Sequence, residues 1–186
     1  MKMTIRRNLF ASGALFLSLT LGLCLWSIDS VRAQDKTGGA AGAADSLDLR
    51  GDVPNPRQIN AAELHQLPRA ETRTTDPGDP GKEIVYAGTP LIEVLKAGGL
   101  RLDADKAGLR ETLTTTVLVD ASDGYRAVFA LAELDSELTD RVILLADTKD
   151  GRALSSREGP FRIIVPGEKR PARWVRQVTA VTVRKN

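Results

Sequence analysis

Apolar and polar residues alternate in several short runs along the chain, with a period of two that is typical of β-strands. In the first run, from Ser46 to Gly51, Leu47 and Leu49 face one side and charged residues face the other. Valine, isoleucine and threonine, which favour strands, are frequent in the later runs. The pattern predicts roughly eight to ten short strands, over residues 46–51, 71–75, 82–87, 112–120, 125–129, 141–147, 161–165 and 176–183.

Helices are predicted to be few and short. Asn60 is followed three residues later by a glutamate, which predicts a capping box at the start of one helix. Thr89 and Pro90 predict the N-cap and the first position of a second helix, which ends at the glycine pair 98–99. Residues 103–110 are interpreted as a short helix or a loop.

Turn signals separate the predicted strands. The sequence Asp-Pro-Gly-Asp-Pro-Gly at 76–81 predicts a hairpin with a long loop between the strands that flank it. Ser122–Gly124 and Asp150–Gly151 predict tight turns. Many short strands with few helices indicate an α+β fold, formed as a single β-rich domain.

The N-terminal residues have the pattern of an export signal. Basic residues precede an apolar run over 9–28, and Val31-Arg32-Ala33 fits a small-x-small cleavage site. The pattern predicts a signal peptide over 1–33, a flexible linker over 34–45 and a domain over 46–186, and we expect the protein to be periplasmic or secreted. The alternative is an uncleaved segment, which would be the protein's sole attachment to a membrane.

Cysteine and charge limit the chemistry. The one cysteine, Cys24, lies within the predicted signal peptide, so the predicted domain has no thiolate for metal binding or nucleophilic catalysis. The full chain has a net charge of +2, yet residues 157–186 contain eight basic and two acidic side chains. This local positive charge indicates an anionic ligand. Nucleic-acid binding is not expected, because aromatic residues make up only 4% of the chain.

The same basic segment contains the most specific motif. Residues 159–167 read Gly-Pro-Phe-Arg-Ile-Ile-Val-Pro-Gly, and a basic loop follows that ends at Arg173-Trp174. The motif resembles the pterin-binding segment of the sulfite oxidase-type molybdopterin-binding domain. Residues 86–95 also resemble the start of a helix in that family. The resemblance covers most of residues 46–183 and implies a β-rich fold with a molybdopterin cofactor and oxidoreductase activity.

The resemblance identifies candidate binding residues. Arg162 matches the family's arginine that contacts the pterin phosphate, and Arg173 stands at the basic position before the tryptophan. Arg157 lies near the position where the family typically has histidine, and Arg176 is the next arginine of the segment after Arg173. A guanidinium binds phosphate through two parallel hydrogen bonds, which suits this role. The alternative is that these arginines form ordinary surface ion pairs.

A second group of candidates follows a predicted central strand. Residues 115–124 are interpreted as the counterpart of the family segment that supplies a cysteine ligand to molybdenum. This stretch offers the oxygens of Ser122 and Asp123 but no sulfur. Tyr125 is a candidate donor to an oxyanion. The alternative for Ser122 and Asp123 is a tight turn, and Trp174 is interpreted as a packing residue.

Two functions remain open at this point. The first is an exported molybdopterin-binding-like domain that has lost the metal–thiolate centre and binds an anionic small molecule or a periplasmic partner protein. The second is a molybdenum-dependent oxidoreductase whose metal is held without cysteine. We expect no bound cofactor under the first hypothesis and molybdopterin under the second. No residue is assigned as a metal ligand.

Overall fold

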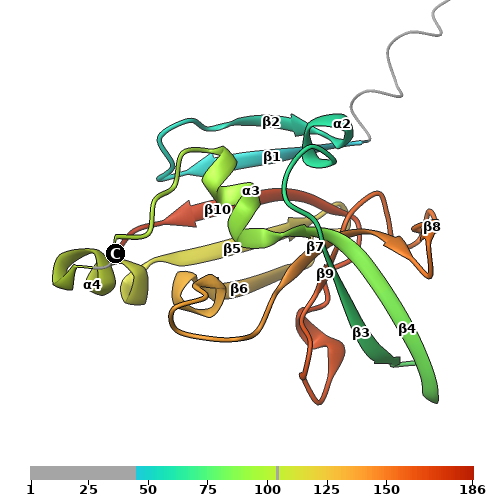
Figure 1. Ribbon diagram of the computed structural model, residues 1–186. Helices are drawn as coiled ribbons and strands as arrows, with labels where there is room; N and C mark the ends of the chain where they lie inside the picture. Colours follow the sequence, from blue (N-terminus) through green and yellow to red (C-terminus); the bar gives the residue numbers. More distant parts are fainter. Residues whose placement is uncertain (1–44, 104) are drawn as a thin grey trace, which may run out of the picture. The chain divides into compact units, whose positions relative to one another are not determined.

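The computed structural model describes residues 45–103 and 105–186 (Figure 1). The predicted signal peptide, and the predicted linker up to residue 44, lie outside the described residues. Within the described part of the chain, ten strands form two sheets, accompanied by three α-helices and two 3-10 turns. No helix in this part is long and apolar enough to cross a membrane. The predicted β-rich α+β class is confirmed.

The first sheet brings the two ends of the domain together. Its central strand is the last one in the chain, which pairs in parallel with the first strand through Leu49 and Val181. All other pairs in this sheet are antiparallel. The order across the sheet is β2 (Arg57–Asn60), β1 (Ser46–Gly51), β10 (Val178–Arg184), β5 (Thr116–Ala121) and β6 (Arg126–Ala130).

The second sheet is antiparallel throughout. It consists of β3 (Ala70–Asp76), β4 (Asp79–Pro90), β7 (Leu144–Lys149) and β8 (Arg152–Ala153), and β9 (Arg162–Ile164) also pairs with β7. The predicted hairpin is present as β3–β4 (Figure 1), but its loop is shorter than predicted, because Asp76 already pairs with Asp79. The Asp76 carboxylate accepts a hydrogen bond from Gly78 N at 2.9 Å and closes the turn.

The first two helices test the capping predictions. Asn60 caps α2 (Ala61–Leu64) in a complete capping box, as predicted. The prediction for α3 (Leu91–Ala97) is wrong by one residue: Pro90 is the N-cap, and Thr89 stays in β4. Strand pairing with β7 continues through Pro90, and the Thr89 hydroxyl donates to Leu64 O at 3.1 Å.

The strand predicted over 112–120 is wrong in its first part. Lys106–Thr114 forms helix α4, and β5 begins only at Thr116. The N-cap of α4, Asp105, accepts a hydrogen bond from Gly108 N at 2.7 Å. The threonines of this stretch favour strands, but capping and tertiary packing override a weak local preference. The C terminus lies beside α4 (Figure 1), where Lys185 pairs with Glu111.

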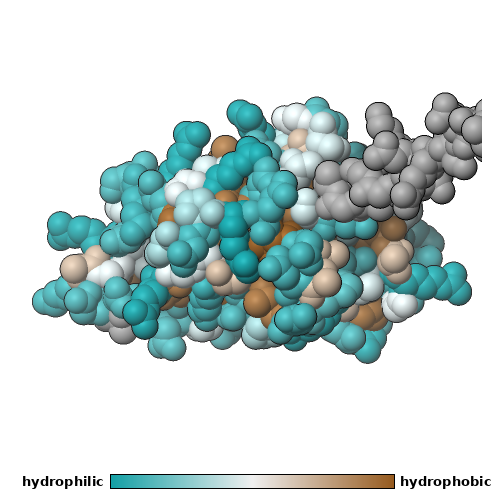
Figure 2. All heavy atoms as spheres, turned by 90° about the horizontal axis from the view of Figure 1, so that it is seen from above, coloured by the Kyte–Doolittle hydropathy of each residue, from teal (hydrophilic) through white to brown (hydrophobic). Residues whose placement is uncertain are grey.

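The apolar faces of both sheets and of α3 form one continuous core. Leu47, Phe129 and Val181 reach it from the first sheet, and Ile84 and Ile163 reach it from the second; all five are fully buried. Each such side chain stabilises the fold by about 1.5–3 kcal/mol relative to its exposed state. On the face shown in Figure 2, hydrophilic residues predominate and hydrophobic ones lie in small, separate areas.

The connection from β9 to β10 positions the candidate site. It runs beside β9, where Ile163 N donates to Val175 O at 2.8 Å. Its short 3-10 turn, η2 (Pro171–Arg173), directs Trp174 inward, and the indole Nε1 donates to Val165 O at 3.0 Å. Trp174 is 6% exposed, so the prediction that it is a packing residue agrees with its burial.

Candidate functional site

Arg162 lies between two aromatic rings. Its guanidinium carbon is 5.7 Å from the centre of the Tyr86 ring and 5.8 Å from that of Trp174, within the range of a cation–π contact. The two rings meet edge to face at 6.1 Å. This packing leaves the Arg162 side chain only 11% exposed. The sequence therefore places a positive charge in a recess of the domain, held by residues from β4 and from the β9–β10 connection.

The guanidinium is only partly satisfied. Nη1 donates to the Glu158 carboxylate and, at 3.3 Å, to the Tyr86 hydroxyl. Burial raises the pKa of Tyr86, against the opposing charges of Arg162 and Lys149, so the phenol is neutral at physiological pH. Nε is buried, and no described residue accepts a hydrogen bond from it. A buried N–H without a partner costs about 1–3 kcal/mol, so an acceptor that reached Nε after a local movement of side chains would be stabilising here.

A pocket of about 320 Å³ opens beside this arginine, and we call it the Arg162 pocket. Trp174 and the 171–172 segment form part of its wall. Four of the seven predicted site residues line it: Asp123, Tyr125, Arg162 and Arg176. Arg176 is exposed and forms no ion pair with any described residue. The pocket therefore joins one recessed and one exposed guanidinium.

The turn residues are engaged in local hydrogen bonds. Asp123 accepts from Tyr125 N at 2.9 Å, which is the geometry of the predicted tight turn. The Tyr125 hydroxyl donates to Ala172 O at 2.7 Å, so in this arrangement it can accept a hydrogen bond but not donate one to a ligand. Ser122 lies outside the Arg162 pocket, and its hydroxyl donates to the Gln177 side chain at 2.9 Å.

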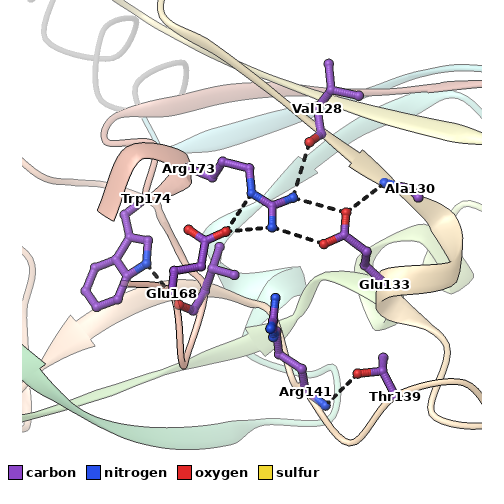
Figure 3. A network of polar contacts seen from close by, with 9 residues as sticks. Val128, Ala130, Glu133, Thr139, Arg141, Glu168, Arg173 and Trp174 are labelled. Atoms are coloured by element: carbon purple, nitrogen blue, oxygen red, sulfur yellow. Dashed lines mark hydrogen bonds and ion pairs between the residues drawn. The ribbon is translucent and has the colours of Figure 1, made fainter. Parts of the chain in front are cut away.

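Arg173 is held in a separate network of charges (Figure 3). Nε donates to Glu168 at 2.7 Å, and Nη1 and Nη2 each donate to Glu133 at 3.0 Å. The guanidinium carbon also lies 4.7 Å from the centre of the Phe129 ring. Arg173 does not line the Arg162 pocket, and two carboxylates occupy its donors.

This network shifts the protonation of its members. Burial alone would raise the pKa of Glu133, but hydrogen bonds from Arg173 and Ala130 N, with the charges of Arg173 and Arg141, outweigh it and lower that pKa. The hydrogen bond to Glu133 raises the pKa of Arg173, and Glu168 adds to the effect. Charges that stabilise each other in this way indicate a structural clamp between η1 (Leu131–Leu134) and the 168–173 loop.

The remaining candidate, Arg157, lies in an exposed turn. It lines neither the Arg162 pocket nor the separate pocket that Ser122 and Gln177 line. The structure adds two residues to the candidate site that the sequence did not identify. They are Tyr86 and Glu158, and each accepts a hydrogen bond from Arg162. Glu158 precedes Arg162 by four residues, and this spacing was the available signal. Tyr86 is 76 residues away from Arg162, so no local pattern connects them.

These residues do not fit the molybdenum cofactor that the resemblance implies. The chain's one cysteine is Cys24, outside the described residues, and no group of three or more potential metal-binding side chains occurs in residues 45–103 or 105–186. A soft thiolate, which suits a high-valent metal, is therefore missing from the site. Arg173, expected to hold the pterin, binds Glu133 and Glu168 instead.

No model of a protein family and no curated protein matches the sequence. Among solved structures, the chain is similar to the sulfane dehydrogenase SoxCD from Paracoccus pantotrophus, with a TM-score of 0.56 and 18% sequence identity. The match covers 75% of this chain but only 38% of that one. At this identity the similarity establishes the fold, and it confirms the predicted sulfite oxidase-type molybdopterin-binding architecture.

Proposed function

We propose that the chain is an exported binding protein for a small anion, with the Arg162 pocket as its site. The supporting observation is the Arg162 guanidinium, which is recessed at the pocket wall and has a buried Nε without an acceptor among the described residues. Arg176 supplies a second positive charge on the same pocket. Two guanidinium groups at one concave site are suited to a carboxylate or another oxyanion.

The pocket favours a small molecule over a partner protein. Its volume of about 320 Å³ is at the lower end of the range for ligand sites. Arg162 is 11% exposed, so a compact anion would reach it more readily than a side chain on a protein surface. An acidic partner protein would instead bind the exposed Arg176 and Arg157.

A binding role, rather than a catalytic one, also agrees with the hydrogen bonds of the side chains that could coordinate a metal. The oxidoreductase alternative requires a cofactor held by oxygen ligands near Ser122 and Asp123, but hydrogen bonds within the protein engage these side chains. The alternative predicts molybdenum and pterin in protein purified from its native compartment. Near-stoichiometric amounts of both would overturn the proposal and favour the enzyme.

The experiment is a calorimetric titration of the purified protein with sulfate and, separately, with phosphate. We expect saturable binding with a Kd of about 1 mM, because the Arg162 donors are partly engaged. Arg176→Gln should weaken it about tenfold, the loss expected for one charge-assisted contact at an exposed site. Arg157→Gln is the matched control, since Arg157 is also exposed but lies outside the pocket. Equal weakening by both variants would indicate a general effect of surface charge.

A further inference from the structure

Glu158 already binds the guanidinium that the proposed ligand would use. Its carboxylate accepts from Arg162 Nη1, and the two side chains are only 18% and 11% exposed. The other carboxylate oxygen accepts from the Ser155 hydroxyl at 3.3 Å. A carboxylate and a small oxyanion make the same kind of bond to a guanidinium, so Glu158 is chemically equivalent to a ligand built into the chain.

The charges around Arg162 determine how strongly the pocket attracts an anion. Asp123 also lines the pocket, so Glu158 and Asp123 together balance the charges of Arg162 and Arg176. An incoming anion would therefore meet little net attraction while the Glu158 carboxylate remains in place. Repulsion between like charges is strong at low exposure, because little water separates them.

We infer that Glu158 is a built-in competitor that sets the affinity and selectivity of the Arg162 pocket, and that a bound anion displaces its carboxylate from Arg162. This inference rests on the proposed function of the pocket. It adds that a residue of the chain lowers anion affinity, so that only a ligand with enough further contacts to replace the Glu158 bond binds tightly.

The local backbone allows the side chain to move alone. Glu158 lies in a turn between β8 and β9, where its N–H donates to Ser155 O at 2.9 Å and its carbonyl accepts from Gln177 N at 2.9 Å. These two bonds do not involve the carboxylate. Rotation of the side chain would release Arg162 without opening the turn, and replacement of the carboxylate by an amide of the same shape should preserve the fold.

The test compares sulfate binding by the wild-type protein and Glu158→Gln at one pH and ionic strength, by calorimetry. We expect the amide variant to bind sulfate at least about tenfold more tightly, because it removes the competing charge and retains the shape. Glu158→Asp, whose shorter side chain reaches Arg162 less well, should give an intermediate gain and serves as the second variant if the amide fails to fold. Glu168→Gln is the control. It also removes a carboxylate from the basic segment 157–186, but this carboxylate binds Arg173 and not Arg162.

The outcomes separate the two proposals. If the wild-type protein binds sulfate through Arg176 and neither Glu158 variant binds more tightly, the competitor role is wrong and the binding function stands. If Glu168→Gln gives the same gain as Glu158→Gln, the effect is general electrostatics, and the inference is also wrong. If no variant binds sulfate or phosphate, both proposals are overturned.

Discussion

Replacement of Arg173 by methionine tests whether this arginine is a clamp or a ligand residue. The resemblance to molybdopterin-binding domains implies a ligand role, whereas the structure shows its guanidinium bound to Glu133 and Glu168. Methionine retains an apolar, unbranched side chain but removes every hydrogen bond, the charge and the guanidinium that lies over Phe129. Arg173→Met should therefore destabilise the fold and leave anion binding unchanged.

The magnitude follows from the contacts. Removal of one partner from a fully buried ion pair costs about 3–5 kcal/mol, because a charge remains buried and unpaired. Here the side chains of Arg173, Glu133 and Glu168 are 29%, 32% and 16% exposed, so water partly compensates. We expect a loss of about 2 kcal/mol in the free energy of unfolding. For a domain of this size, that loss lowers Tm by roughly 6 °C.

Urea denaturation followed by circular dichroism measures the effect, and a double-mutant cycle with Glu133→Gln locates it. The glutamine substitution should cost about 1–2 kcal/mol in the wild-type protein and much less in Arg173→Met, because the shared contact is already lost. A destabilisation below about 0.5 kcal/mol would refute the clamp. So would a variant of unchanged stability that has lost anion binding.

Two further predictions concern the fold. Gly51 has a φ of +85°, and a Cβ there would lie 2.0 Å from Val183 O, so Gly51→Ala should cost about 3 kcal/mol in urea denaturation. Gly124→Ala, at a φ of +82° with no atom within 4 Å of its Cβ, should cost only about 1 kcal/mol, and equal losses would contradict the steric argument. The pKa of Glu133 is lowered in the folded protein, so its contribution to stability is present at neutral pH and is lost as the pH falls through that lowered value. Glu133→Gln should therefore lose less stability than the wild-type protein on acidification, and parallel denaturation profiles would contradict this.

The sequence predicted the strands well where burial alternates. In the first strand the predicted and observed bounds agree at 46–51, because Leu47 and Leu49 must face the core and Asp48 and Arg50 must not. The capping box at Asn60 was also predictable, since the residues that form it are three apart. Helix α4 was predicted only in part: residues 103–110 were interpreted as a short helix or a loop, but its end was assigned to a strand because its threonines favour strands.

The candidate site was predictable only in part. The basic segment identified Arg162 and Arg176, which do share a pocket. The motif could not show that the Arg173 guanidinium is already bound to the Glu133 carboxylate, because Glu133 lies 40 residues earlier in the chain. Tyr86 reaches Arg162 only because β4 and β9 both pair with β7. Local sequence patterns identify which residue types could form such a site. The fold decides which of the arginines pair with carboxylates of the chain and which are available to a ligand.

The most direct test of the central claim is an NMR titration with sulfate that follows the Nε–H of Arg162 and the indole N–H of Trp174. Both groups belong to residues that line the pocket, and the arginine N–H has no acceptor among the described residues. We predict that both signals shift together and saturate, and that the same titration of Arg176→Gln reaches saturation at about tenfold higher sulfate. If these two signals stay fixed while the protein remains folded, the Arg162 pocket does not bind small anions and the account is wrong.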